Sequence, residues 1–238
     1  MRNVLLATLL SLSLPVAANP LPKPIEGKIT KGWFTNDAMG CMLLQECTED
    51  VKRVRNTNDV QKIFSNQNFS AVRKEFDSLT RSFDKLGINV YIASPKYFPV
   101  GHRGVYHTVS NHFYLNEAYV SRPHVFMAVV RHEGWHAAQD CMAGTLNNSL
   151  IAIIHPEDQV PKMWQNMAER TYFQQPSAIP WEKEAFWAGH TEGMTAQAVI
   201  PSVCPAQNAS FSQGIAEGCW KYVLSAIFCH ILGTWSSG

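Results

Sequence analysis

The chain has 238 residues, of which 46% are hydrophobic and 16% are charged, and its formal net charge is +1. This composition is typical of a globular protein and excludes an intrinsically disordered chain. A charge this small produces no long-range field for nucleic acid or an anionic membrane, so we expect no nucleic-acid partner.

The first residues resemble an export signal. Arg2 provides a positive start, residues 4–16 form an apolar segment, and small residues end at Ala18. We therefore predict a signal peptide over residues 1–18 that is removed, because the apolar segment is too short for a comfortable membrane span. Cleavage leads to a periplasmic or secreted protein with no stable membrane insertion.

Cleavage after residue 18 leaves a chain whose length suits one well-buried domain over residues 19–238. Residues 19–35 are rich in proline and glycine, and they predict an extended lead-in. No cysteine or sizeable inhibitory segment occurs in this lead-in. The sequence does not predict an oligomeric state.

Hydrophobic periodicity predicts the regular elements that follow. Steps of three and four between apolar residues indicate an amphipathic helix over 69–86, and residues 88–93 form a short β-rich segment. Alternation over 105–115 predicts one longer strand beside a cleft, where an extended peptide could add to its edge. A helix over 123–142 begins at a proline, and residues 147–238 read mostly as helices separated by prolines.

Six cysteines are present, and in an oxidising compartment after export we expect them to form disulfides. Spacing alone does not select among 15 connectivities. Cys41 with Cys47 and Cys219 with Cys229 are the candidate local bridges, and Cys141 is a candidate for a bridge to the C-terminal half.

The motif His132-Glu133-Gly134-Trp135-His136 is the strongest chemical signal in the chain. Residues four apart on a helix share one face, so His132 and His136 can bind one metal ion while Glu133 lies beside a bound water. Zinc lowers the pKa of such a water towards about 7, and the glutamate can accept its proton. The pattern therefore predicts one Zn²⁺ per chain, with Glu133 as the catalytic base.

A catalytic zinc usually has three protein ligands. No third histidine follows His136 at a short fixed spacing, which favours a glutamate from a later helix. Glu184, in an apolar helix start rich in aromatic residues, is the preferred ligand. Glu182 competes with it, because residues two apart on a helix point in different directions. Glu192 is a third candidate ligand. The non-functional alternative is that Glu182 and Glu184 are a solvated acidic pair at the start of a helix, where the helix dipole favours negative charge.

These residues resemble the zincin metallopeptidases, in particular the glutamate-liganded branch typified by thermolysin. His132, Glu133 and His136 match the HExxH motif of that family, and Glu184 would match its downstream glutamate. The resemblance implies an α+β, zincin-like fold with a small mixed sheet over the active-site helix and a mostly helical C-terminal subdomain. It also implies peptide-bond hydrolysis.

Two supporting roles have candidates in the sequence. An oxyanion formed on the substrate needs a stabilising donor, for which His190 is preferred, with Tyr172 and His230 as alternatives. Asp140, one turn beyond His136, is the candidate for orienting a histidine ring. Trp135 and Gln139 either shape the pocket or simply pack.

The predicted function is an exported zinc-dependent peptidase acting on a protein or peptide substrate. Three alternatives remain open, of which the first two are a disulfide-stapled binding protein with a non-catalytic zincin-like fold and a zinc hydrolase acting on a non-peptide bond. A structural zinc site, or two packed histidines without metal, is a third. Side-chain preference for the substrate depends on pocket walls that come from distant parts of the chain.

Overall fold

The computed structural model describes residues 24–25, 38–144, 146 and 150–199. The predicted signal peptide and lead-in fall almost entirely outside these residues, as do Cys204, Cys219, Cys229 and His230. Within them, the fold is mixed α+β, with a small four-stranded sheet and several helices, as the sequence predicted. None of the helices in this part of the chain is long and apolar enough to cross a membrane.

The four-stranded sheet has the order β2-β3-β5-β4 and is mixed. Its central pair, β3 and β5, is parallel, whereas β2 and β4 are antiparallel edge strands. The strands are β2 Val51–Arg53, β3 Asn89–Ala93, β4 Gly104–His107 and β5 His112–Asn116. A separate two-stranded sheet pairs β1 Pro24–Ile25 with β6 Ile151–Ala152.

The prediction of one longer strand over 105–115 is wrong, because the chain folds there into the hairpin β4–β5. Asn111 adopts a φ of 56°, a left-handed conformation that asparagine tolerates and that suits a turn. Alternation of apolar residues continues through both arms of the hairpin, so the pattern does not mark where the chain reverses. The turn leaves Val109 64% exposed although it continues the apolar alternation.

The two faces of the sheet have different cores, as the period of two in β5 requires. Phe113 and Leu115 face the main core, which also contains apolar residues of α3 Arg73–Lys85 and α4 Pro123–Met142. Tyr114 faces the other side, where it packs against α1 Ala38–Leu43 and the 3₁₀ turn Pro95–Tyr97. A disulfide between Cys41 and Cys47 closes the end of α1, which confirms this predicted local bridge, and Cys141 is disulfide-bonded as well.

The helix predicted over 123–142 is α4, with the bounds that its initial proline and apolar pattern indicated. The helix predicted over 69–86 is a 3₁₀ turn, Ser70–Val72, followed by α3. The remaining helices and turns are α2 Thr57–Ile63, the 3₁₀ turn Glu157–Gln159, α5 Lys162–Thr171, α6 Ile179–Gly189 and α7 Met194–Ala198.

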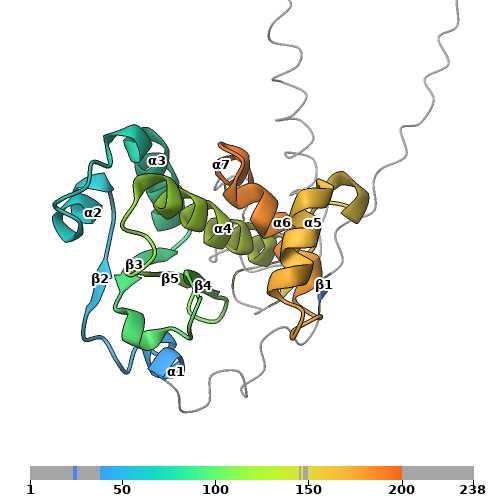
Figure 1. The fold of residues 1–238 in the computed structure, drawn as a ribbon, viewed down its shortest axis with the longest axis horizontal. Helices are drawn as coiled ribbons and strands as arrows, with labels where there is room; N and C mark the ends of the chain where they lie inside the picture. The colour runs from blue at the N-terminus through green and yellow to red at the C-terminus, as the bar shows by residue number, and fades with distance from the viewer. Residues whose placement is uncertain (1–23, 26–37, 145, 147–149, 200–238) are drawn as a thin grey trace, which may run out of the picture.

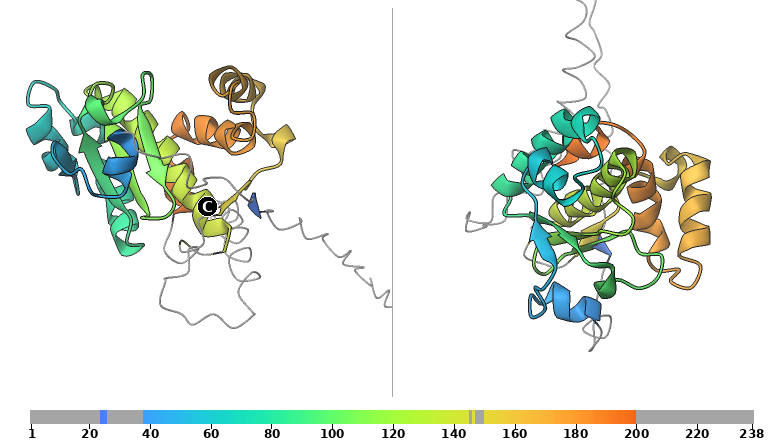
Figure 2. Two further views of the ribbon diagram at one scale, coloured as in Figure 1. Left: turned by 90° about the horizontal axis from the view of Figure 1, so that it is seen from below. Right: turned by 60° about the vertical axis from the view of Figure 1, so that its left-hand side comes forward.

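Helix α4 lies in the middle of the molecule, between the sheet and the helices α5 and α6 (Figure 1). It contacts β4 and β5 on one side and α6 and α7 on the other. In the left view of Figure 2, α2 and α3 lie at the opposite end of the molecule from α5. Gly134 allows this packing, because a Cβ there would lie 2.8 Å from both Phe83 of α3 and Thr195 of α7. The HExxH motif, on α4, therefore lies between the sheet and α3 on one side and α6 and α7 on the other.

Candidate metal centre

The two histidines of the motif converge with a glutamate of α6. The Nε2 atoms of His132 and His136 are 3.3 Å apart. A carboxylate oxygen of Glu182 lies 3.2 Å from the Nε2 of His132, and its other oxygen lies 3.4 Å from the Nε2 of His136. One ligand atom from each of the three residues lies within 4.8 Å of the others, so a single ion could bind all three.

Small residues bring α6 close enough to α4 for this contact. Ala185 and Ala188 pack against Trp135 of the motif. A Cβ on Gly189 would lie 3.0 Å from the carbonyl oxygen of Ala128 in α4. The close approach allows a glutamate, whose side chain is short, to reach the histidine rings.

The preferred third ligand, Glu184, does not face the histidines, and Glu182 takes that place. Two residues that are two positions apart in a helix differ by about 200° around its axis, so only one of the pair can point at a given neighbour. Glu184 is fully buried on another side of α6, where it accepts hydrogen bonds from Gln139 at 2.7 Å and from Trp135 at 3.1 Å. Glu192 lies beyond the end of α6 and is exposed.

The electrostatic environment of His132, His136 and Glu182 favours a positive charge between these side chains. Burial lowers the pKa of His136, but the Glu182 carboxylate outweighs burial and raises that pKa to about 9. Burial raises the pKa of Glu182, and the two histidines reverse this effect and hold it well below its usual range. The buried Oε2 of Glu182 has no hydrogen-bond partner of good geometry among the described residues. A cation between these groups would satisfy this oxygen, so the residues fit a metal ion.

Glu133 lies against the edge strand β4, beside the ligand group. Burial raises the pKa of Glu133, while His132 and His136 lower it to a smaller extent. A Cβ on Gly104 would lie 2.6 Å from Oε1 of Glu133, so glycine at this position makes room for the carboxylate. This role of Gly104 was not predicted, because nothing in the local sequence distinguishes it from a turn glycine.

A cleft of about 560 Å³ opens beside the ligand group. Its walls come from residues 100–104 at the start of β4, from α4 and from α5 and α6; the lining residues include His132, Glu133, Tyr172, Phe186 and His190. Burial, followed by the nearby carboxylate of Glu182, raises the pKa of Tyr172 well above its usual range. The ring of His190 stacks on Trp164 at 4.3 Å, and its Nδ1 donates to the carbonyl of Phe186. Both predicted oxyanion donors in the described residues therefore line one cleft.

The predicted orienting residue, Asp140, contacts a different group. It accepts a hydrogen bond from the hydroxyl of Tyr106 at 2.9 Å, whereas Nδ1 of His136 lies 2.9 Å from Oε1 of Gln139. By the helical repeat, Asp140 is rotated from His136 by about 40° towards β4, and Gln139 by about 60° in the opposite sense, towards α6. The only sequence signal for an orienting residue is its position one helical turn beyond His136. Gln139 and Asp140 both have that position, so the sequence does not choose between them.

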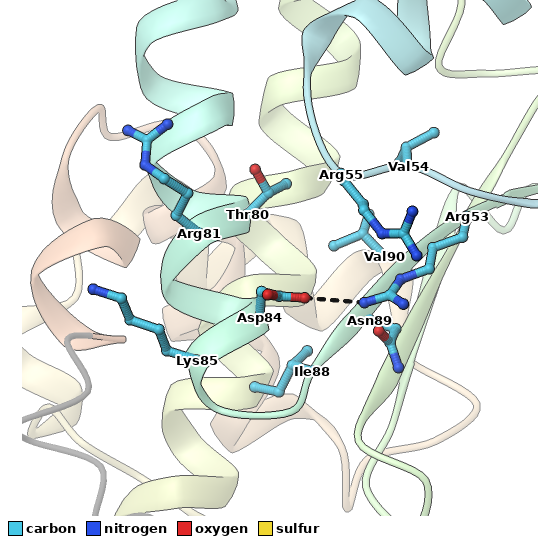
Figure 3. Close-up of a pocket in the computed structure, with 10 residues that line it drawn as sticks. All are labelled: Arg53, Val54, Arg55, Thr80, Arg81, Asp84, Lys85, Ile88, Asn89 and Val90. Atoms are coloured by element: carbon cyan, nitrogen blue, oxygen red, sulfur yellow. Dashed lines mark hydrogen bonds and ion pairs between the residues drawn. The ribbon is translucent and has the colours of Figure 1, made fainter.

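A second cavity, of about 310 Å³, lies between α3, the end of β2 and the start of β3 (Figure 3). It has a cationic rim, in which Arg53 pairs with Asp84 at 3.0 Å. Arg81 and Lys85 project away from this ion pair, so the positive groups do not converge on one point. The candidate metal ligands in the described part of the chain are therefore at the α4–α6 contact and not in this cavity.

Comparison of the chain with known protein families, curated proteins and solved structures finds no match. The geometry of the site is therefore the basis on which its function is inferred.

Proposed function

We propose that this chain is an exported zinc-dependent peptidase with a zincin-like fold, in which His132, His136 and Glu182 bind the metal. The observation that carries the proposal is the convergence of these three side chains beside a cleft that Glu133 also lines. Two imidazole nitrogens and one carboxylate oxygen are a common ligand set for catalytic zinc. When bound, zinc would supply Lewis-acid activation of water and of the substrate carbonyl.

Glu133 is the proposed general base and acid. Its carboxylate lines the cleft beside His132, and burial raises its pKa above the usual range of a carboxyl group, which suits a proton acceptor. It accepts a proton from the attacking water and returns one to the leaving amine.

Tyr172 is the favoured donor to the oxyanion of the substrate, ahead of His190. It lines the cleft close enough to Glu182 for that carboxylate to raise its pKa, whereas the Nδ1 of His190 is hydrogen-bonded to the carbonyl of Phe186. A neutral phenol, which the raised pKa maintains, has a proton to donate as charge develops on the carbonyl oxygen.

The edge strand β4 is the proposed docking site for an extended peptide. Within the described sheet it pairs with β5 alone, and Gly104, its first residue, lines the cleft. Main-chain hydrogen bonds to such an edge place a peptide beside Glu133 without demanding a particular side chain.

The Cys41–Cys47 disulfide supports the proposed export, because such bridges persist in oxidising compartments.

The test measures zinc stoichiometry and hydrolysis of a quenched peptide library by the wild type, Glu133→Gln, Glu182→Ala and Glu192→Gln. We expect one zinc per wild-type chain, zinc loss in Glu182→Ala, and retained zinc with at least about 10²-fold lower hydrolysis in Glu133→Gln. Glu192→Gln is the matched control, because this exposed glutamate lies near α6 but not in the site, and both of its values should equal those of the wild type.

Other outcomes identify the alternatives. Zinc binding without peptide hydrolysis points to a non-peptide substrate or to a binding protein with a zincin-like fold. Absence of zinc from the reconstituted wild type refutes the metal centre.

A further inference from the structure

We infer that Gln139 and Glu184 act together as positioning residues that fix the proton of His136 on Nδ1 and direct its Nε2 lone pair at the metal. The inference rests on the proposed metal centre and deepens it. It gives Glu184, which is buried close to the centre without facing it, a role in zinc binding through Gln139.

A continuous chain of hydrogen bonds joins the three side chains. Nδ1 of His136 lies 2.9 Å from Oε1 of Gln139, and Nε2 of Gln139 lies 2.7 Å from Oε2 of Glu184. The same amide nitrogen also donates to the carbonyl oxygen of Trp181 at 3.1 Å. All three side chains are at least nine-tenths buried, so water does not compete strongly for these bonds.

The partners of Gln139 determine which of its amide atoms faces the histidine. The carboxylate of Glu184 and the carbonyl of Trp181 are both acceptors, so the NH₂ group must point at them. The amide oxygen then faces His136, and Nδ1 of that ring must donate a proton to it. The remaining ring nitrogen, Nε2, is the one that faces His132 and Glu182.

Glu184 is held as an acceptor by its other contacts. Trp135 Nε1 donates to it at 3.1 Å, and the backbone N–H of His155 donates as well. Burial raises its pKa, and these donors, together with Gln139, oppose that effect. A carboxylate in this position strengthens the amide dipole of Gln139 and thereby makes His136 a better metal ligand.

The experiment exchanges the two functional groups. Gln139→Glu places two carboxylates against each other, and Glu184→Gln places two amides there. The double variant Gln139→Glu/Glu184→Gln restores one acceptor and one donor in the opposite order. The carboxylate that the double variant carries at position 139 still accepts the proton on Nδ1 of His136.

Zinc affinity is measured at pH 8 by competition with a chromophoric chelator, and the folded fraction by circular dichroism. We expect each single variant to bind zinc about 10- to 100-fold more weakly. The double variant should recover part of that loss, because the contact between positions 139 and 184 is restored whereas the carbonyl of Trp181 loses its donor. A slowly exchanging Nδ1–H proton of His136 should be visible by NMR in the zinc-loaded wild type and double variant, and weakened in the single variants.

Gln165→Glu is the matched control. Gln165 is also buried, and its amide donates to the carbonyl oxygens of Glu157 and Val160 away from the ligand group. The same chemical change there should lower stability but leave zinc affinity unchanged. If Gln139→Glu does not fold, Gln139→Met removes the acceptor without adding charge, and it should weaken zinc binding by a similar factor.

Three outcomes would overturn the inference: single variants that bind zinc as the wild type does, a double variant that sums the two single losses, or a wild type that binds no zinc. A wild type that binds zinc but hydrolyses no peptide refutes the proposed activity alone. The variants would still test the positioning role in that case.

Discussion

The two sides of α4 differ in how they hold the helix. The side towards the sheet and α3 packs apolar residues such as Phe126 and Val130 into the main core, where both are fully buried. The side towards α6 joins polar groups, among them His136 and Gln139, to two buried glutamates. Apolar burial needs no particular partner, whereas each polar group needs one matched donor or acceptor. We therefore expect substitutions on the first side to change stability, and those on the second to change the site as well.

The largest effect is expected from removing a ring on the sheet side. Phe126 is fully buried, with its ring centre 4.7 Å from that of Phe76 and 5.5 Å from that of Phe69. Phe126→Ala should lower the free energy of unfolding by about 3–5 kcal/mol, because it leaves a cavity. Urea denaturation measures the change, and Phe126→Leu should lose less. An equal loss in both variants would mean that cavity size is not the cause.

The next largest effect is expected from a buried polar residue on the sheet side, which is otherwise apolar. His107, at the end of β4, is 5% exposed, and burial, with a smaller contribution from His112, lowers its pKa to about 4. Between pH 6.5 and 4 the unfolded chain therefore binds this proton more readily than the folded chain. The resulting loss of stability begins as the pH falls below 6.5, reaches up to about 3 kcal/mol near pH 4, and does not grow below that.

His107→Gln removes this titration. The stability difference between wild type and variant, followed by urea denaturation from pH 8 to pH 4, should therefore change in favour of the variant as the pH falls. A difference that is independent of pH would show that the folded chain protonates His107 normally.

A smaller effect is expected at the boundary between the two sides. Gly104→Ala would place a methyl carbon 2.6 Å from Oε1 of Glu133 and 2.9 Å from Cγ1 of Val129. Since a misplacement of about 1 Å can cost about 10²-fold in rate, we expect peptide hydrolysis to fall by that order with zinc content unchanged. Loss of zinc in this variant would instead indicate a collapse of the ligand group.

The smallest effect is expected from one donor on the α6 side. Trp135→Phe keeps an aromatic ring against His155 but removes the N–H that donates to Glu184. We expect a loss of about 1–2 kcal/mol in the free energy of unfolding, because the buried carboxylate keeps its other donors. Zinc affinity should change by less than it does in Gln139→Glu. A larger change would place Trp135 within the positioning chain.

Local patterns predicted the elements of the fold where neighbours in sequence decide them. The helix α4 begins at Pro123 and follows an apolar stripe, and the Cys41–Cys47 bridge spans a short loop. The hairpin β4–β5 was missed because alternation does not record a reversal of the chain. Asp140 and Gln139 were both within reach of His136 by spacing, and the choice between them depended on which neighbouring element each one faces.

The sequence by itself determined the pairing of His132 and His136, because the helical repeat alone puts residues four apart on one face. It also limited the candidates for a third metal ligand to a few later glutamates. Only the tertiary structure decided between Glu182 and Glu184, since the answer depends on how α6 is rotated against α4. That rotation follows from the small residues and aromatic rings packed between the two helices, and no local pattern in either segment encodes it.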